Sequence, residues 1–229
     1  MCGRFTQTAT PETIAKHFKL PDVPLFTKNY NVSPSHKVAA VRLHAESGQR
    51  DAVLFRWGLI PSWAKDMKIG FQCINAKAET ISEKPAFRSA FRKKRCLIVA
   101  DGFYEWQKTT RDGKERKQAM RICRKDRDLF AFAGLWERWE GDGGRDEPIE
   151  SCTIITTAPN ELMRAIHNRM PVILPPDAYE QWLDPLSQPE ALRMLLRSCP
   201  SEDLEAYPVT ALVGNPRNNA PALLDRITV

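Results

Sequence analysis

The residue after the initiator is the first candidate for chemistry. The chain begins Met1-Cys2-Gly3-Arg4, and the small Cys2 side chain predicts removal of Met1 by methionine aminopeptidase. Cys2 would then carry a free α-amine beside its thiol, with ordinary pKa values of about 7.7–8.0 and 8.5. Such an aminothiol condenses with an aldehyde to an imine, which the thiolate closes into a thiazolidine ring. It could instead attack an amide, as N-terminal nucleophiles do, or be a cysteine placed there by chance.

Two further segments place polar side chains in apolar surroundings. Asn75 and Glu79 lie in the mostly small stretch 73–80. A buried carboxamide there would donate to an oxyanion or orient a sugar oxygen, whereas in a turn it would satisfy its own backbone. Glu105 lies between aromatics in residues 103–106, where poor solvation favours its protonated form and general acid–base catalysis. An outward-facing strand glutamate fits the alternation equally well.

His167 is one of four histidines and precedes Arg169. A lone histidine is more often a structural group than a catalyst, and the four are too scattered to predict a metal site. The six cysteines contain no CxxC pair, so a zinc ribbon and a thioredoxin-like motif are excluded. We therefore expect no metal and no cofactor.

Cysteine usage and hydropathy indicate the compartment. The N-terminus lacks a signal peptide pattern, so we expect free thiols in a reducing, cytoplasmic location, with Cys96 and Cys152 in the core. No apolar run approaches the roughly 18 residues of a membrane helix. The net charge is +6, and residues 84–127 hold fifteen Lys and Arg against five Asp and Glu. This basic zone suits a polyanion such as nucleic acid, although a solvated surface explains it as well.

The element pattern favours an α+β fold. Strands are expected close together in the middle of the chain, with short helices on either side and without βαβ alternation, which predicts a mixed or antiparallel, barrel-like sheet in one domain spanning 1–229. The expected strands are 38–43, 53–57, 96–100, 103–108, 118–123, 129–135, 152–157, 170–174 and 206–210. The expected helices are a short one from Pro11, 84–91, 160–166, 176–183 and 189–197 with Ser187 as its cap. Residues 24–35 are turn-rich, Asp112-Gly113 predicts a hairpin turn, and 141–144 predicts a surface loop.

Together these features resemble one family. Cys-Gly-Arg-Phe at the start is followed in order by 30–34 (YNVSP), 57–63 (WGLIPSW), 75–80 (NAKAET), 102–106 (GFYEW), 156–158 (TTA) and 167–171 (HNRMP). The chain resembles the SOS response-associated peptidase (SRAP) family, whose members include sensors that cross-link to abasic sites in single-stranded DNA. The resemblance spans residues 2 to about 219 and implies a single α+β domain with a barrel-like β core and a basic groove.

The resemblance implies roles for four residues. Cys2 would form the thiazolidine with the abasic-site aldehyde, and Asn75 would hold the sugar oxygen. Glu105 would shuttle protons, and His167 would assist the Schiff-base steps and slow reversal. A β-lyase activity would be a side reaction of the same amine.

The resemblance also implies a DNA surface. Its expected contacts are Arg4, Asn31, Pro34, Trp63, Lys77, Thr156 and Arg169. Relatives often carry Arg at position 77, and Lys keeps the charge without bidentate geometry. Some relatives have two adjacent aromatics where this chain has Trp63-Ala64.

Two other functions stay open at this point. One is a cysteine-type peptidase with Cys2 as nucleophile, including autocatalytic removal of Met1. The other is a non-covalent module that binds single-stranded DNA. For the reading that the resemblance implies, we expect a monomer, nucleoid-associated in the cytoplasm, with single-stranded DNA that contains abasic sites as partner and no membrane; no replication-fork partner is identified.

Overall fold

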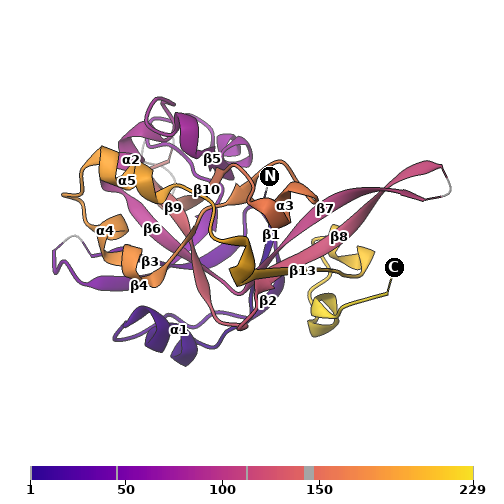
Figure 1. Ribbon diagram of the computed structural model, residues 1–229. Helices are drawn as coiled ribbons and strands as arrows, with labels where there is room; N and C mark the ends of the chain where they lie inside the picture. Colours follow the sequence, from indigo (N-terminus) through magenta and orange to yellow (C-terminus); the bar gives the residue numbers. More distant parts are fainter. Residues whose placement is uncertain (1, 45, 112, 142–146, 229) are drawn as a thin grey trace.

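The fold is organised around a small closed barrel (Figure 1). The computed structural model describes residues 2–44, 46–111, 113–141 and 147–228. Within them, β9 pairs with both β6 and β10, so the strand order β10-β4-β3-β6-β9 returns to β10. The β10–β4 pairing is parallel and the others are antiparallel. The predicted mixed, barrel-like α+β fold is confirmed.

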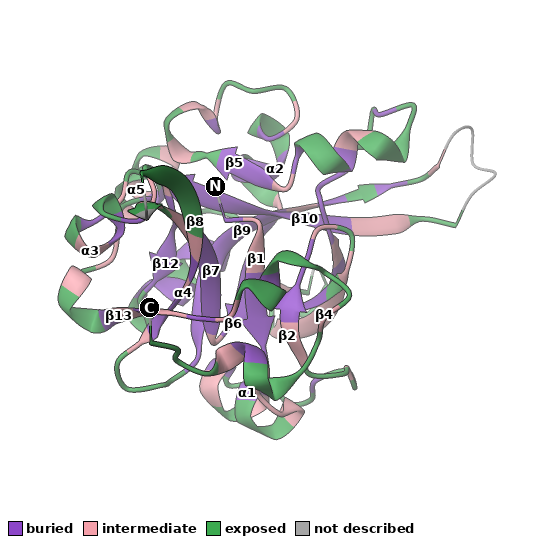
Figure 2. Ribbon diagram, turned by 90° about the vertical axis from the view of Figure 1, so that its right-hand side faces the viewer, coloured by how far each residue is buried: buried purple, intermediate pink, exposed green. Residues whose placement is uncertain are grey.

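A second, antiparallel sheet lies against the barrel. Its order is β13-β8-β7-β1-β2. Phe5 of β1 packs on Trp57 and Phe132 of the barrel, with ring centroids 5.1 and 5.7 Å apart. Buried residues concentrate in these strands, whereas the surface helices and loops are largely exposed (Figure 2). This packing brings the start of the chain onto the barrel.

The elements have the following bounds. The barrel strands are β3 (Lys37–Leu43), β4 (Arg50–Trp57), β6 (Arg95–Ala100), β9 (Phe130–Trp139) and β10 (Ile149–Thr157), extended by β5 (Asn75–Lys77), β11 (Met170–Pro171) and β12 (Ile173–Leu174). The second sheet contains β1 (Arg4–Gln7), β2 (Asn29–Val32), β7 (Gly102–Arg111), β8 (Lys114–Arg124) and β13 (Leu204–Pro208). The α-helices are α1 (Pro11–Phe18), α2 (Arg88–Lys93), α3 (Glu161–Arg164), α4 (Tyr179–Leu183) and α5 (Pro189–Leu195). The 3₁₀ turns are η1 (Met67–Gln72), η2 (Ala78–Thr80), η3 (Pro176–Ala178), η4 (Ser201–Asp203), η5 (Ala211–Gly214) and η6 (Pro221–Leu224).

Local signals predicted some helix boundaries and missed others. Helix α1 starts at Pro11, and the Thr10 hydroxyl accepts a hydrogen bond from the Thr13 amide at 3.3 Å. The expected cap at Ser187 is wrong: Gln188 precedes α5 without a side-chain cap, and the Ser187 hydroxyl donates to the Gln181 carbonyl at 2.7 Å. The expected helix 84–91 begins only at residue 88, because turns precede it. A hydroxyl near a helix start can serve another carbonyl, which sequence spacing cannot reveal.

Three short strands escaped prediction. Strands β1, β2 and β5 have three or four residues each, and β2 lies inside the turn-rich stretch 24–35. Such short segments are strands because neighbours pair with them. The expected turn at Asp112-Gly113 lies partly outside the described residues, as does most of the loop 141–144, but Arg111 pairs with Lys114 across it and Gly113 has φ +70°.

Two observations bear on cysteines and membranes. Cys96 and Cys152 are fully buried, which confirms the core prediction. In the described part of the chain, no helix has the length and apolar character needed to cross a membrane.

The approach to β5 depends on contact between two glycines. Gly58 has φ +115°, and a Cβ there would lie 2.7 Å from the Gly70 carbonyl oxygen. We expect Gly58→Ala to lower the free energy of unfolding by about 2–4 kcal/mol in denaturant melts, from backbone strain and the clash together. Gly48→Ala is the matched control: φ is +65° and nothing lies within 4 Å, so its cost should be about 1–2 kcal/mol. Equal losses in both variants would contradict this account.

Candidate functional site

Strand pairing places Cys2 beside the end of β7 that carries Glu105. Strand β1 runs antiparallel to β7, with Arg4 opposite Tyr104 and Phe5 opposite Phe103. The Cys2 side chain is fully buried. Burial, and then the charge of Glu105, raises the pKa of the Cys2 thiol well above its ordinary value. The nitrogen of Cys2 is an amide in the full chain, which includes Met1.

Asn75 contacts the same residue from β5. Its Nδ2 donates to the Cys2 carbonyl oxygen at 2.9 Å. The Asn75 Oδ1 is buried and accepts no hydrogen bond from the described residues. β5 is held in place by parallel pairing with β10, where Asn75 lies opposite Ile154. Asn75 therefore contacts Cys2 through one N–H and leaves its Oδ1 acceptor unused by the described residues.

Glu105 and His167 interact electrostatically. Glu105 is only 3% exposed. Burial raises the pKa of Glu105, and the positive charge of His167 partly offsets that rise. The Nδ1 atom of His167 lies 3.1 Å from the Arg169 amide nitrogen and 3.3 Å from the Arg169 carbonyl oxygen. When Nδ1 accepts from the amide, a neutral ring carries its proton on Nε2. The four predicted catalytic residues are thus brought to one place from two strands, the segment before β1 and the loop after α3.

A cavity of about 590 Å³ opens beside Glu105 and His167. Its lining comes from β7, β8 and the segment that begins at the end of α3: Glu105, Trp106, Lys108, Lys117, Arg164, Ala165, Ile166, His167 and Asn168. No motif in the sequence singles out Lys108, Lys117 or Arg164. The turn expected at Asp112-Gly113 contained a usable signal, because a hairpin with that turn predicts Lys108 opposite Lys117, which is the observed register.

A second group surrounds Thr156 at the end of β10. Thr156 lies opposite Lys77 of β5 and opposite Pro171 of β11. Arg169 donates to the Thr156 carbonyl at 2.6 Å and forms a bidentate ion pair with Glu79 at 2.7 and 2.9 Å. The hydrogen bond from Arg169 lowers the pKa of Glu79. The structure therefore joins three of the expected DNA contacts, with Lys77 exposed at the surface.

Arg4 and Asn31 lie in a different network. The Arg4 guanidinium donates to Asn31 Oδ1 at 2.9 Å and to the carbonyls of Val213 and Gly214 at 2.6 and 3.1 Å. The fully buried Asn31 amide donates to three carbonyls within 213–218. Asn31 thus anchors Arg4 and the C-terminal segment, and a phosphate contact by Arg4 stays a prediction.

The apolar surface is larger than the sequence indicated. Trp63 is 59% exposed and Pro34 is half-buried. Phe71 of η1 is also 58% exposed, with the Arg56 guanidinium 5.6 Å from its ring centroid. No pattern singles out Phe71, because a lone aromatic is more often a core residue. Both rings are available for stacking.

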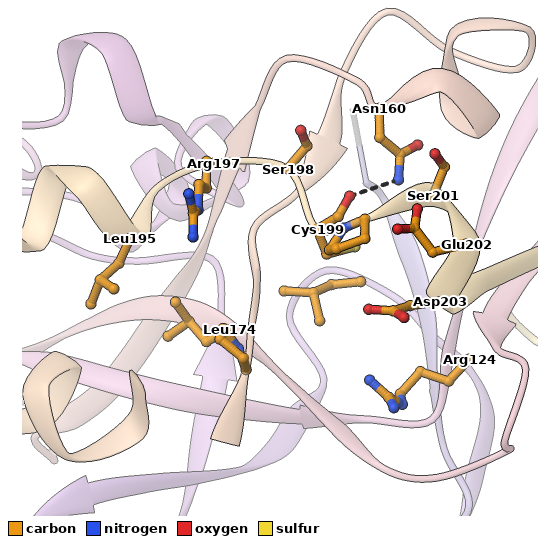
Figure 3. A pocket seen from close by; sticks show the side chains of 13 residues that line it. Arg124, Asn160, Leu174, Leu195, Arg197, Ser198, Cys199, Ser201, Glu202 and Asp203 are labelled. Atoms are coloured by element: carbon orange, nitrogen blue, oxygen red, sulfur yellow. Dashed lines mark hydrogen bonds between the residues drawn. The ribbon is translucent and has the colours of Figure 1, made fainter. Parts of the chain in front are cut away.

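A second cavity contains none of the predicted residues (Figure 3). It measures about 520 Å³ and lies between β12 and the segment from α5 to η4. Asn160 donates to the Cys199 carbonyl there at 3.0 Å. Burial, and then the charge of Asp203, raises the pKa of the Cys199 thiol to about 12. The raised pKa makes this thiol a weak nucleophile at neutral pH.

The fold and site together define a class: an α+β barrel protein with a buried cysteine close to the start of the chain, beside an amide, a carboxyl and an imidazole side chain. Comparison with known proteins identifies the family. The sequence profile of the family described as SOS response associated peptidase (SRAP) matches residues 1–216, and the chain belongs to this family.

Named relatives cover almost the entire chain. The abasic site processing protein YoqW of Bacillus subtilis is 46% identical over 98% of this chain and 99% of its own length. YoaM of the same organism, also called an abasic site processing protein, is 48% identical over 98% of each chain. A crystal structure of a Bacteroides thetaiotaomicron protein superimposes with a TM-score of 0.86 and 29% identity, covering 99% of this chain and 100% of its own.

Proposed function

We propose that this protein processes abasic sites in single-stranded DNA by covalent capture through Cys2. The observation that carries the proposal is the convergence of Asn75, Glu105 and His167 on the amino-terminal cysteine. The names of the relatives support abasic-site DNA as substrate. We further propose that the protein acts as a monomer, in the cytoplasm, on nucleoid DNA.

The proposed cross-linking reaction proceeds in three steps. Hydrolysis of the Met1–Cys2 bond, by an aminopeptidase or by the site itself, releases the Cys2 amine. That amine adds to the aldehyde carbon of the ring-opened sugar, and loss of water leaves an imine. The thiolate then adds to the imine carbon while the nitrogen gains a proton, closing the thiazolidine.

The neighbouring groups match these steps. The buried Oδ1 of Asn75 can accept a hydrogen bond from the sugar hydroxyl that ring opening creates. The raised pKa of Glu105 suits a group that gives a proton to the departing water and takes one from the thiol. His167, which lines the same cavity, can donate from Nε2. A lyase reaction would follow if the imine lost its β-phosphate before the ring closed.

A denaturing gel tests the proposal. The protein, with Met1 removal verified by mass spectrometry, is incubated with a single-stranded oligonucleotide that carries one abasic site. We expect a heat-stable shifted band, and a mass equal to protein plus DNA minus one water. Absence of the band with verified Cys2 at the terminus would refute covalent capture. Cys2-dependent cleavage of peptide substrates would instead favour the peptidase.

The free amine provides a further prediction. A variant with Met-Ala-Ala inserted before Cys2 keeps the thiol but blocks the amine. We expect its yield of heat-stable product to fall at least 100-fold, because a thiol alone forms only a reversible hemithioacetal. Undiminished cross-linking by the extended protein, confirmed intact by mass, would contradict the aminothiol mechanism.

A further inference from the structure

Three cationic side chains line the cavity beside Glu105 and His167. They are Lys108 of β7, Lys117 of β8 and Arg164 of α3. Lys108 lies directly opposite Lys117. Directly opposed residues of an antiparallel pair lie on the same face with Cβ atoms about 4.5–5.5 Å apart, and like charges there destabilise the pair. Packing alone therefore does not explain this arrangement.

These cations lack the partners that nearby arginines have. Within the described part of the chain, Lys108, Lys117 and Arg164 form no ion pair and all three are exposed. By contrast, Arg124 of the same ribbon is paired with Asp126. The one carboxylate among the cavity-lining residues is the buried Glu105. Three positive charges at the cavity are therefore not neutralised by ion pairs with the described residues.

A hydrogen bond ties together the two segments that carry Lys108 and Arg164. The Gln107 side chain donates to the Ala165 carbonyl at 2.9 Å, which ties β7 to the segment that leads to His167. Lys108 and Arg164 directly adjoin the two residues of this hydrogen bond. Beyond it, the β7–β8 ribbon extends away from the body of the protein (Figure 1). A ligand that leaves the cavity along the ribbon must pass these side chains.

We propose that Lys108, Lys117 and Arg164 form a phosphate subsite that binds the DNA backbone on one side of the abasic nucleotide. The identity of the ligand as DNA rests on the proposed function. The charge, exposure and location of the three residues carry the rest, since lysine and arginine that neutralise phosphates release counterions and strengthen binding. The subsite would hold the strand where it leaves the reactive cavity.

The first test measures reversible binding only. The probe is a fluorescent single strand with a tetrahydrofuran abasic analogue, which has no aldehyde and cannot be cross-linked. We expect Lys108→Gln/Lys117→Gln to weaken binding about tenfold at low salt. The slope of log K against log salt should fall by about 0.7 for each phosphate that the variant no longer neutralises. The control Lys16→Gln/Lys28→Gln removes the same charge in α1 and just before β2, at two positions that do not line the cavity. Equal effects in both pairs would overturn the subsite, leaving only a long-range field.

A second test locates the phosphate. Single methylphosphonates, which are uncharged, replace each phosphate near the lesion in turn. We expect one or two positions on one side to weaken wild-type binding, and Lys108→Gln/Lys117→Gln to be insensitive at those same positions. If the double variant keeps the wild-type pattern at every position, the proposal is wrong.

One substitution separates binding from folding. Lys108→Glu places opposite charges across the ribbon, so we expect a higher thermal midpoint together with weaker DNA binding. A lower midpoint would show that the lysine pair stabilises the fold and would count against the subsite. Because none of these assays involves the aldehyde, they succeed or fail independently of cross-linking by Cys2.

Discussion

Replacing Cys2 by serine will abolish the heat-stable attachment to abasic-site DNA. Serine keeps the amine and can form an imine, but its hydroxyl closes an oxazolidine, which opens far more readily than a thiazolidine. We expect less than 1% of the wild-type product after heating, whereas borohydride will still trap the imine. A denaturing gel with and without borohydride measures both quantities.

Cys199→Ser is the matched control for that experiment. Cys199 is partly exposed, and its thiol pKa is raised to about 12 by burial and the charge of Asp203. We expect this variant to cross-link at the wild-type rate. Loss of product in both variants would indicate a general effect of thiol removal. Full product from Cys2→Ser would show that the thiol of Cys2 is not the second nucleophile.

Glu105→Gln will slow cross-linking by about 10²- to 10⁴-fold, the usual contribution of a positioned acid–base group. The amide keeps the shape of the side chain but cannot carry the proton between the amine, the departing water and the thiol. Reversible binding to the tetrahydrofuran probe should change less than twofold. Rates from quenched time courses measure the loss. An equal fall in binding would show that Glu105 is structural.

The same substitution should raise stability at neutral pH. Burial raises the pKa of Glu105 above its value in the unfolded chain, so the native state holds this proton more tightly. The resulting stabilisation is present at low pH and is lost as pH rises through the raised pKa. Glu105→Gln avoids that loss. The stability difference between variant and wild type should therefore be small near pH 4 and grow toward pH 8 in denaturant melts.

A second buried carboxylate provides the control for Glu105. Glu137 of β9 is 5% exposed and pairs with Lys94 on the barrel. Glu137→Gln leaves Lys94 unpaired, so we expect it to lower stability without affecting the rate of cross-linking. Slower chemistry in this variant would indicate that Glu105→Gln also acts through the barrel.

The local sequence pattern was sufficient to predict most strands and the start of one helix. The runs 38–43, 96–100 and 152–157 became β3, β6 and β10 because apolar, β-branched segments between turns pack well in a sheet. Thr10 and Pro11 set the start of α1 through a cap and a preset φ. These features act over a few residues, so the chain encodes them locally.

The residue types also indicated the chemistry. An amino-terminal cysteine, an Asn in a small-residue stretch, a Glu between aromatics and a His before Arg169 each suggest a role from their own functional groups. None of these local features shows that the four side chains lie close together in the fold. Asn75 reaches the Cys2 carbonyl only because β5 pairs with β10, and Glu105 reaches Cys2 only because β1 pairs with β7.

The sequence by itself therefore determined which side chains could react, where the main strands lie and the register in which β7 pairs with β8. Only the tertiary structure decided that β9 closes the barrel onto β10, that Asn31 holds Arg4 against the carbonyls of 213–218, and that Lys108, Lys117 and Arg164 gather at the cavity without ion-pair partners among the described residues. The physical reason is the distance along the chain over which each interaction acts. Propensities, caps and turns act between near neighbours, whereas these contacts join segments up to about two hundred residues apart, and packing and desolvation in the complete fold select them.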